Sequence, residues 1–201
     1  MATPNTIFHS FHYGFDEETI PALTPQSVAL LRQRTATQLA SAGIILTPAE
    51  VAQIEIADCG LGEIETLGLQ LVVYVNTDRC CAKELVMFAN QVFPEHRHPP
   101  VGDDPGKEET FRCRQGEVYL YVEGPATANP RGTPPPARAA YFSVWHEVVL
   151  RPGEQYTLQP NIKHWFQAGP DGCIVSEFST HSSDELDIFS DPTIQRIPTV
   201  Q

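Results

Sequence analysis

The stretch PEHRHP, residues 94–99, is the most informative part of the sequence. Its two histidines, His96 and His98, are two positions apart, so both side chains point to the same face of a β-strand. Glu109 opens a later strand that can fold back beside the first, and His164 follows far along the chain. Three imidazoles and one carboxylate suit Mn, Fe, Co, Ni or Zn better than Ca or Mg. Four such ligands leave two positions of an octahedral ion open, so the set predicts a catalytic metal site.

The chain around this stretch has the pattern of a β-rich protein. From about residue 62, apolar and polar residues alternate in short runs separated by Gly and Pro. Residues 125–138 are rich in Pro and Gly and predict a loop, and Gly116 predicts a turn. This spacing of short strands predicts an all-β sandwich or barrel. The expected strands lie near residues 69–74, 85–89, 109–113, 118–122, 139–150, 155–159, 162–168 and 172–180.

Two helices are expected before the strands. The first begins at Thr24-Pro25 and runs over residues 24–42, ending at a glycine. The second begins with the capping box of residues 47–50, Thr-Pro-Ala-Glu. We therefore expect a single domain, with an N-terminal arm and helices over residues 1–60 packed on a barrel and C-terminal segment over residues 61–201.

Composition excludes several classes of function. The 201 residues carry a net charge of −12, from 13 basic and 25 acidic residues, which argues against nucleic acid and anionic membrane surfaces as partners. No apolar run reaches the roughly 18 residues of a membrane span. The N-terminus lacks the pattern of a secretory signal, and the five cysteines are an odd number without a CxxC motif. A cytoplasmic protein with reduced thiols is expected.

The order of the candidate ligands resembles the two motifs of the cupin superfamily. The first motif corresponds to His96-Arg97-His98 and residues 109–116, and the second to residues 160–164. The resemblance implies a cupin double-stranded β-helix, a jelly-roll barrel in which both motifs meet inside the mouth. The gap before Glu109 is longer than is usual, which predicts a longer hairpin over residues 99–106, and the second motif lacks the family glycine.

A narrower resemblance covers most of the chain. Segments from about residue 35 to 198 are similar to D-lyxose isomerases, a family of cupin sugar isomerases. The most specific of them are NTDRCCAKELV (76–86), KEETFRCRQGEVYLYVEG (107–124), LQPNIKHWFQAG (158–169), SEFST (176–180) and DELDIF (184–189). One departure is Ile188, where family members commonly have Asn, and it bears on the sugar preference.

The resemblance implies a Mn-dependent isomerase that interconverts D-lyxose and D-xylulose, often with D-mannose and D-fructose as a second pair. It places the metal ligands at His96, His98, Glu109 and His164. It also implies a homodimer, to which the tyrosines 119 and 121 on the outer face of a strand would contribute, unless both pack under the N-terminal helices.

Moving a carbonyl between two carbons of a sugar needs an electrophile, a base and a donor to the enediolate oxygen. A metal would be the electrophile. Glu177 is the candidate base, since it lies on a strand among mostly apolar residues. Lys107 precedes Glu109 by two residues and can share its face, as the donor and a sugar ligand. Asp187 is a candidate to bind sugar hydroxyls or to close the C-terminal segment over the barrel. His181 could line the pocket or lie in a loop without a role in the site. His146 is expected outside the site.

Two other functions are compatible with the same ligands. An Fe(II) cupin dioxygenase can use three histidines and one glutamate, but it would favour an apolar pocket. A non-catalytic sugar-binding cupin would use the metal only for its structure. The polar candidates Lys107, Glu177 and Asp187 favour the isomerase over the dioxygenase.

Overall fold

The computed structural model describes residues 23–197. Most of the arm expected at the N-terminus lies outside the described residues, as does the end of the C-terminal segment. In chain order the elements are α1 (Pro25–Ser41), α2 (Pro48–Gln53), β1 (Glu55–Ala57), β2 (Leu69–Asn76), β3 (Cys81–Met87), β4 (Val92–Arg97), β5 (Glu109–Val122), the 3-10 helix η1 (Pro136–Tyr141), β6 (His146–Leu150), β7 (Gln155–Leu158), β8 (His164–Ser179), the 3-10 helix η2 (Asp184–Leu186) and β9 (Ile188–Phe189). None of the described helices has the length and apolar character needed to cross a membrane.

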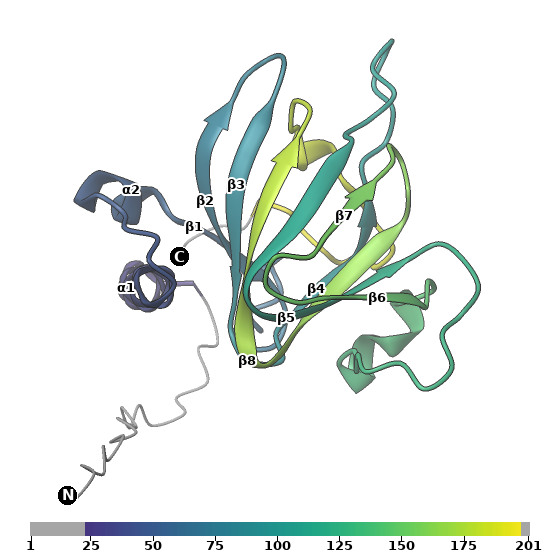
Figure 1. The fold of residues 1–201 in the computed structure, drawn as a ribbon, viewed down its shortest axis with the longest axis horizontal. Coiled ribbons are helices and arrows are strands. Elements are labelled where there is room, and N and C mark those ends of the chain that lie inside the picture. Colours follow the sequence, from purple (N-terminus) through teal and green to yellow (C-terminus); the bar gives the residue numbers. More distant parts are fainter. Residues whose placement is uncertain (1–22, 198–201) are drawn as a thin grey trace, which may run out of the picture.

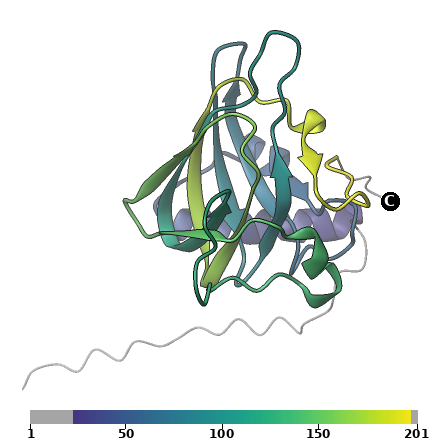
Figure 2. The ribbon, with the colours of Figure 1, turned by 90° about the vertical axis from the view of Figure 1, so that its right-hand side faces the viewer.

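The strands form an antiparallel sheet that curls into a barrel (Figures 1 and 2). Its order is β1-β2-β3-β8-β4-β9, and β5 pairs with β6, β7 and β8. β8 is central: its first half pairs with β4 and its second half with β3, while β5 runs along its whole length. The prediction of a mainly β barrel is confirmed.

The two longest strands differ from the sequence prediction. A turn was expected at Gly116, and two strands over residues 162–180, but β5 and β8 are each continuous and bend together. The bend lies at two facing glycines, with φ of +71° at Gly116 and +76° at Gly172. A Cβ on Gly116 would lie 2.0 Å from the carbonyl oxygen of Gly172. The glycines therefore bend a paired ribbon instead of ending its strands, because β-bulges beside Gly116 absorb the change of direction.

Gly116→Ala is expected to lower the free energy of unfolding by about 3 kcal/mol, because left-handed strain and a backbone clash add. Gly43→Ala is the matched control: φ there is +77°, but a Cβ would meet no atom within 4 Å, so about 1 kcal/mol is expected. Urea unfolding of both variants measures the difference. Equal losses would show that the close approach at the bend contributes nothing.

Helices α1 and α2 pack on the outer face of the sheet, beside β1 to β3 (Figure 1). Both begin as predicted, since Thr24 and Thr47 are N-caps with capping boxes and a proline follows each. An apolar cluster separate from the barrel interior lies between the helices and the sheet. Its buried members include Leu31, Leu39, Ile54, Ile56, Val72, Val86 and Ile174.

The outer side of β5 is covered by the long loop before β6, and this corrects one expectation. Tyr121 is fully buried and stacks on Trp165 with ring centroids 3.9 Å apart. Phe142 and Trp145, which lie just before β6, pack edge-on against this pair. Tyr121 is thus neither an exposed aromatic on the barrel exterior nor a residue under the N-terminal helices.

The interior of the barrel is apolar at one end and charged at the other. The apolar end is filled by the largest core cluster, which includes Phe93, Phe111, Phe166, Cys113 and Cys173. The two cysteines are buried and free, as expected of small core residues. The aromatic rings form a floor beneath the histidines, with Phe93 edge-on to His96 at 5.1 Å and Phe111 edge-on to His164 at 6.3 Å.

Candidate active site

The three predicted histidines come together inside the barrel. His96 and His98 extend from the end of β4, and His164 opens β8 directly opposite His96 in the sheet. One nitrogen from each ring lies within 4.8 Å of the other two, and all three residues are buried. Such a buried cluster can hold a metal ion.

Each histidine has one ring nitrogen occupied by an outer partner. Nδ1 of His96 donates to the carbonyl of Pro94 at 2.9 Å, and Nδ1 of His164 to that of Ile162 at 2.9 Å. Nδ1 of His98 lies 2.5 Å from Oδ1 of Asp187. These bonds leave the Nε2 atoms for the cavity, and outer partners of this kind fix the tautomer and ring orientation of metal-binding histidines.

Glu109, the fourth predicted ligand, lies beside two of the three histidines. Its Oε1 lies 3.1 Å from Nε2 of His98 and 3.1 Å from Nε2 of His164. The geometry to His164 is not that of a hydrogen bond, so Nε2 of His164 is a buried polar atom that has no hydrogen-bond partner within residues 23–197. Glu109 and His164 stand near opposite ends of the β5–β8 ribbon, and the bend of that ribbon accounts for their approach. Three imidazole nitrogens, one of them without a hydrogen-bond partner among the described residues, and a neighbouring carboxylate fit a divalent metal of the borderline class.

The charge states of His96 and Glu109 suit a metal, whereas His98 is protonated in the metal-free protein and would release its Nε2 proton when an ion binds. Burial, together with His164 and His98, holds the pKa of His96 well below its usual value, so this ring is neutral. Burial acts against charge on Glu109 too, but Lys107 and His98 outweigh it and hold the pKa of Glu109 far below its usual range. For His98, Glu109 and the bond to Asp187 outweigh burial and raise the pKa to about 9. The site therefore holds an anionic carboxylate beside its imidazoles.

Lys107 links the metal-ligand candidates to the candidate base. Its Nζ lies 2.9 Å from Oε2 of Glu109 and 2.7 Å from Oε1 of Glu177. All three side chains are at most 6% exposed. Burial alone would lower the pKa of Lys107, but Glu109, Glu177 and Asp184 raise it well above the usual value. The wall around Glu177 is thus charged rather than mostly apolar, contrary to the sequence-based picture.

Lys107→Met is expected to destabilise the metal-free protein by about 3–5 kcal/mol, because two buried carboxylates would lose their shared cation. The matched control is Lys163→Met, which removes a partly exposed lysine 3.6 Å from the buried Glu95 and is expected to cost at most about 1 kcal/mol. Chemical unfolding after chelation gives both values. If the Lys107 variant were as stable as the control variant, the buried ion pairs of Lys107 would not contribute to the stability of the metal-free protein.

Three further charged residues line the inner cavity and were missed by the sequence analysis: Lys83, Asp184 and Arg196. Asp184 accepts from Lys83 at 2.6 Å and from Arg196 at 2.9 Å, and it lies 3.8 Å from Lys107. A signal existed for Lys83, which faces inward on the apolar row of β3 that includes Leu85. Arg196 comes from an irregular segment, where the sequence carries no periodicity.

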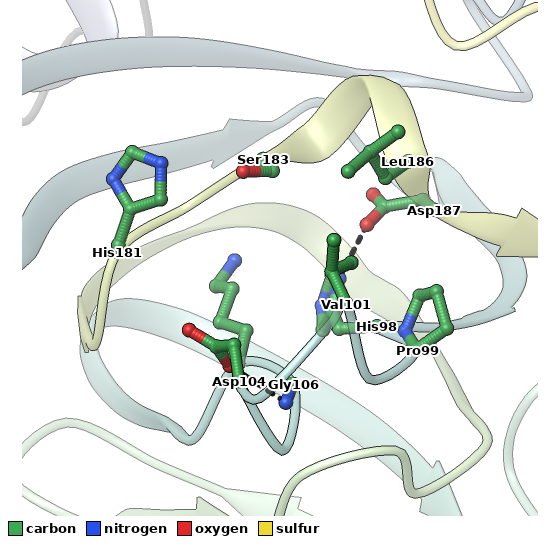
Figure 3. Close-up of a pocket in the computed structure, with 10 residues that line it drawn as sticks. His98, Pro99, Val101, Asp104, Gly106, His181, Ser183, Leu186 and Asp187 are labelled. Carbon is green, nitrogen blue, oxygen red and sulfur yellow. Dashed lines mark hydrogen bonds and ion pairs between the residues drawn. The ribbon is translucent and has the colours of Figure 1, made fainter. Parts of the chain in front are cut away.

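An outer cavity of about 160 Å³ lies beside His98 (Figure 3). The predicted hairpin after β4 forms one wall, with Val101 and Asp104, and the segment before β9 forms the other, with His181, Leu186 and Asp187 (Figure 3). His181 is a wall residue of this cavity, one of the two alternatives left open for it. Its Nδ1 donates to the carbonyl of Thr77 at 3.0 Å.

Of the remaining candidates, His146 lies outside the site, as expected. Its Nδ1 donates to the carbonyl of Pro125 at 3.0 Å at the surface. Ile188, the departure from the resembled family, is 45% exposed and lines neither cavity described here. The side chain at that position therefore faces away from the candidate site.

Comparison with known proteins identifies the family. A protein of Thermosediminibacter oceani named D-lyxose/D-mannose isomerase is 59% identical over 179 residues, which cover 89% of this chain and 99% of that protein. A D-lyxose ketol-isomerase of Cohnella laeviribosi is 58% identical over 170 residues, 85% of this chain and 93% of that protein. The chain belongs to the D-lyxose isomerase family. The model of this family matches residues 137–201, and the named relatives in it are aldose–ketose isomerases.

Solved structures agree on the fold of this D-lyxose isomerase family member. L-ribose isomerase from Cellulomonas parahominis superposes with a TM-score of 0.76, covering 90% of this chain and 99% of that one at 15% identity. The enzyme from Acinetobacter sp. DL28 gives 0.75 at 14% identity, covering 90% and 99%. At these identities the likeness concerns the fold alone, and it confirms the predicted cupin barrel with N-terminal helices.

Proposed function

We propose that this protein is a metal-dependent aldose–ketose isomerase that interconverts D-lyxose and D-xylulose, and also D-mannose and D-fructose. The observation that carries the proposal is the contact of Lys107 with Glu109 on one side and Glu177 on the other. It sets an acid–base pair directly beside the metal-ligand candidates. Membership of a family whose relatives are named for D-lyxose and D-mannose supports the choice of sugars.

Each candidate residue would have a separate role in the reaction. His96, His98, Glu109 and His164 would hold the metal, which supplies a Lewis acid to polarise the sugar carbonyl and its neighbouring hydroxyl. Glu177 would take the proton from C2 of the aldose and return it to C1. Lys107, whose Nζ lies close to both Glu109 and Glu177, would bind the enediolate oxygen through an N–H group. Asp187, which the sequence analysis names as a candidate sugar ligand, lines the outer cavity and contacts Nδ1 of His98 through its carboxylate.

The cavity lining supports an isomerase over a dioxygenase. Charged and imidazole side chains line the inner cavity together with three leucines and an aromatic floor, whereas a dioxygenase acting on apolar compounds would need apolar walls. We propose Mn²⁺ as the metal, with Fe, Co, Ni or Zn as alternatives that the same ligands accept. We also propose that the protein is a homodimer, on the basis of its family, and that it is cytoplasmic. We propose that it is a single domain, with the N-terminal part ending at residue 60 and the barrel part beginning at residue 61.

Turnover by chelated protein, with and without added Mn²⁺, is the test of this function. We expect D-xylulose to form from D-lyxose only when the metal is restored. In D₂O, proton transfer through Glu177 would place deuterium in the product, whereas a hydride shift would not. Absence of ketose from both D-lyxose and D-mannose with every metal tried would refute the proposed function, and oxygen uptake with Fe(II) would then be measured.

A further inference from the structure

We infer that Asp187 is a positioning residue for the metal ligand His98, and that it makes the C-terminal segment part of the metal site. We call residues 182–197 the C-terminal strap. The inference rests on the proposed metal site and assigns Asp187 a role other than that of a sugar ligand. It is tested by metal affinity, which does not depend on the sugar.

The outer partners of the three histidines differ in kind. His96 and His164 are each held by a backbone carbonyl two residues earlier in the chain, so their own strands fix them. His98 is held by the carboxylate of Asp187, which is 89 positions away in sequence and 2.5 Å from Nδ1 (Figure 3). His98 is thus the histidine of this trio whose Nδ1 is held by a side chain from a distant segment.

Asp187 is placed for this role and is shielded from solvent. Its side chain is 4% exposed, and that of His98 is 9% exposed. A hydrogen bond to a charged group is stronger than one between neutral groups and is worth more where water is excluded. With Nδ1 held by Asp187, Nε2 of His98 faces Glu109 at 3.1 Å, which is the direction of the candidate metal position.

The strap that carries Asp187 is fixed at several points. Ser190 donates its hydroxyl to Glu95 at 2.5 Å, and Asp191 accepts from Arg138 at 2.7 Å. β9 pairs with the end of β4, where Phe189 stands opposite His96 and stacks on its ring at 5.3 Å. Asp187 therefore lies on a rigid support, which a positioning residue needs.

Partners of metal-bound histidines typically contribute about 10–100-fold to metal affinity. We expect Asp187→Ala to weaken Mn²⁺ binding by about this factor, measured by titration of metal-free protein without sugar. Asp187→Asn keeps an oxygen that can accept from Nδ1 and is expected to lose less. Asp191→Asn is the matched control: it loosens the strap at a buried carboxylate that contacts no metal-ligand candidate, and its Mn²⁺ affinity should equal that of the wild type.

Kinetics at saturating Mn²⁺ separate positioning from sugar binding. Positioning predicts a KM for D-lyxose within about twofold of the wild-type value once metal is saturating. Unchanged Mn²⁺ affinity with a raised KM in either Asp187 variant would overturn the inference and make Asp187 a sugar ligand. An equal loss of Mn²⁺ affinity in Asp191→Asn would also overturn it, since the strap as a whole would then be responsible. A wild-type protein that binds no metal would refute the proposed function instead.

Discussion

His164→Ala is expected to lower Mn²⁺-dependent turnover of D-lyxose by more than about 10³-fold. Nε2 of His164 is a buried ring nitrogen that has no hydrogen-bond partner in the described part of the chain. Metal ions contribute several kcal/mol of charge stabilisation in such reactions, and each 1.4 kcal/mol corresponds to about tenfold in rate. Loss of the ligand removes this stabilisation and leaves Glu109 without its neighbour at 3.1 Å.

The control for this variant is His146→Ala, because His146 is a surface histidine that lies outside the site. Metal content, turnover and circular dichroism are measured for both proteins, and His96→Ala provides a second ligand variant with the same expected loss. A His164 variant that keeps its fold, its bound metal and more than about a tenth of the wild-type rate would exclude His164 as a ligand.

Much of the candidate metal site could be predicted because strand periodicity is local. His96 and His98 fall on one face through their spacing alone, and Glu109 shares its face with Phe111 for the same reason. The convergence of His164 on these residues has no such local basis, and resemblance to a known family was needed to predict it. The structure explains it through the bend at Gly116 and Gly172, whose effect on strand continuity the sequence pattern does not reveal.

The charged residues behind the site were predictable only in part. Lys83 interrupts an otherwise apolar row of β3, and a lysine at such a position indicates a buried partner. That partner is Asp184, which belongs to the strap and is in turn held by Arg196. Contacts between a strand and an irregular segment about a hundred residues later depend on tertiary packing, so periodicity cannot pair them. For the same reason, the hydrogen bond between His98 and Asp187 could not be predicted from the sequence.

Glu177→Gln is expected to keep the metal and to lose about 10²–10⁴-fold in turnover, the usual contribution of general acid–base catalysis. Glu177 lies on β8 opposite Lys83 in the sheet, and its carboxylate points to the same interior as the metal-ligand candidates. An amide of the same shape cannot accept the C2 proton, but it can still accept a hydrogen bond from Lys107. The fold and the metal affinity should therefore be retained while the rate falls.

Glu84→Gln is the matched control for this prediction. Glu84 is also a buried carboxylate of the sheet, next to Lys83 on β3, but it faces outward and accepts from the hydroxyl of Ser176 at 2.9 Å. Its loss should leave turnover within about twofold of the wild type. An unchanged rate in Glu177→Gln would remove Glu177 as the base. A fall in kcat at saturating metal, together with loss of deuterium incorporation in D₂O, would instead be the result expected if this carboxylate carries the proton between C2 and C1.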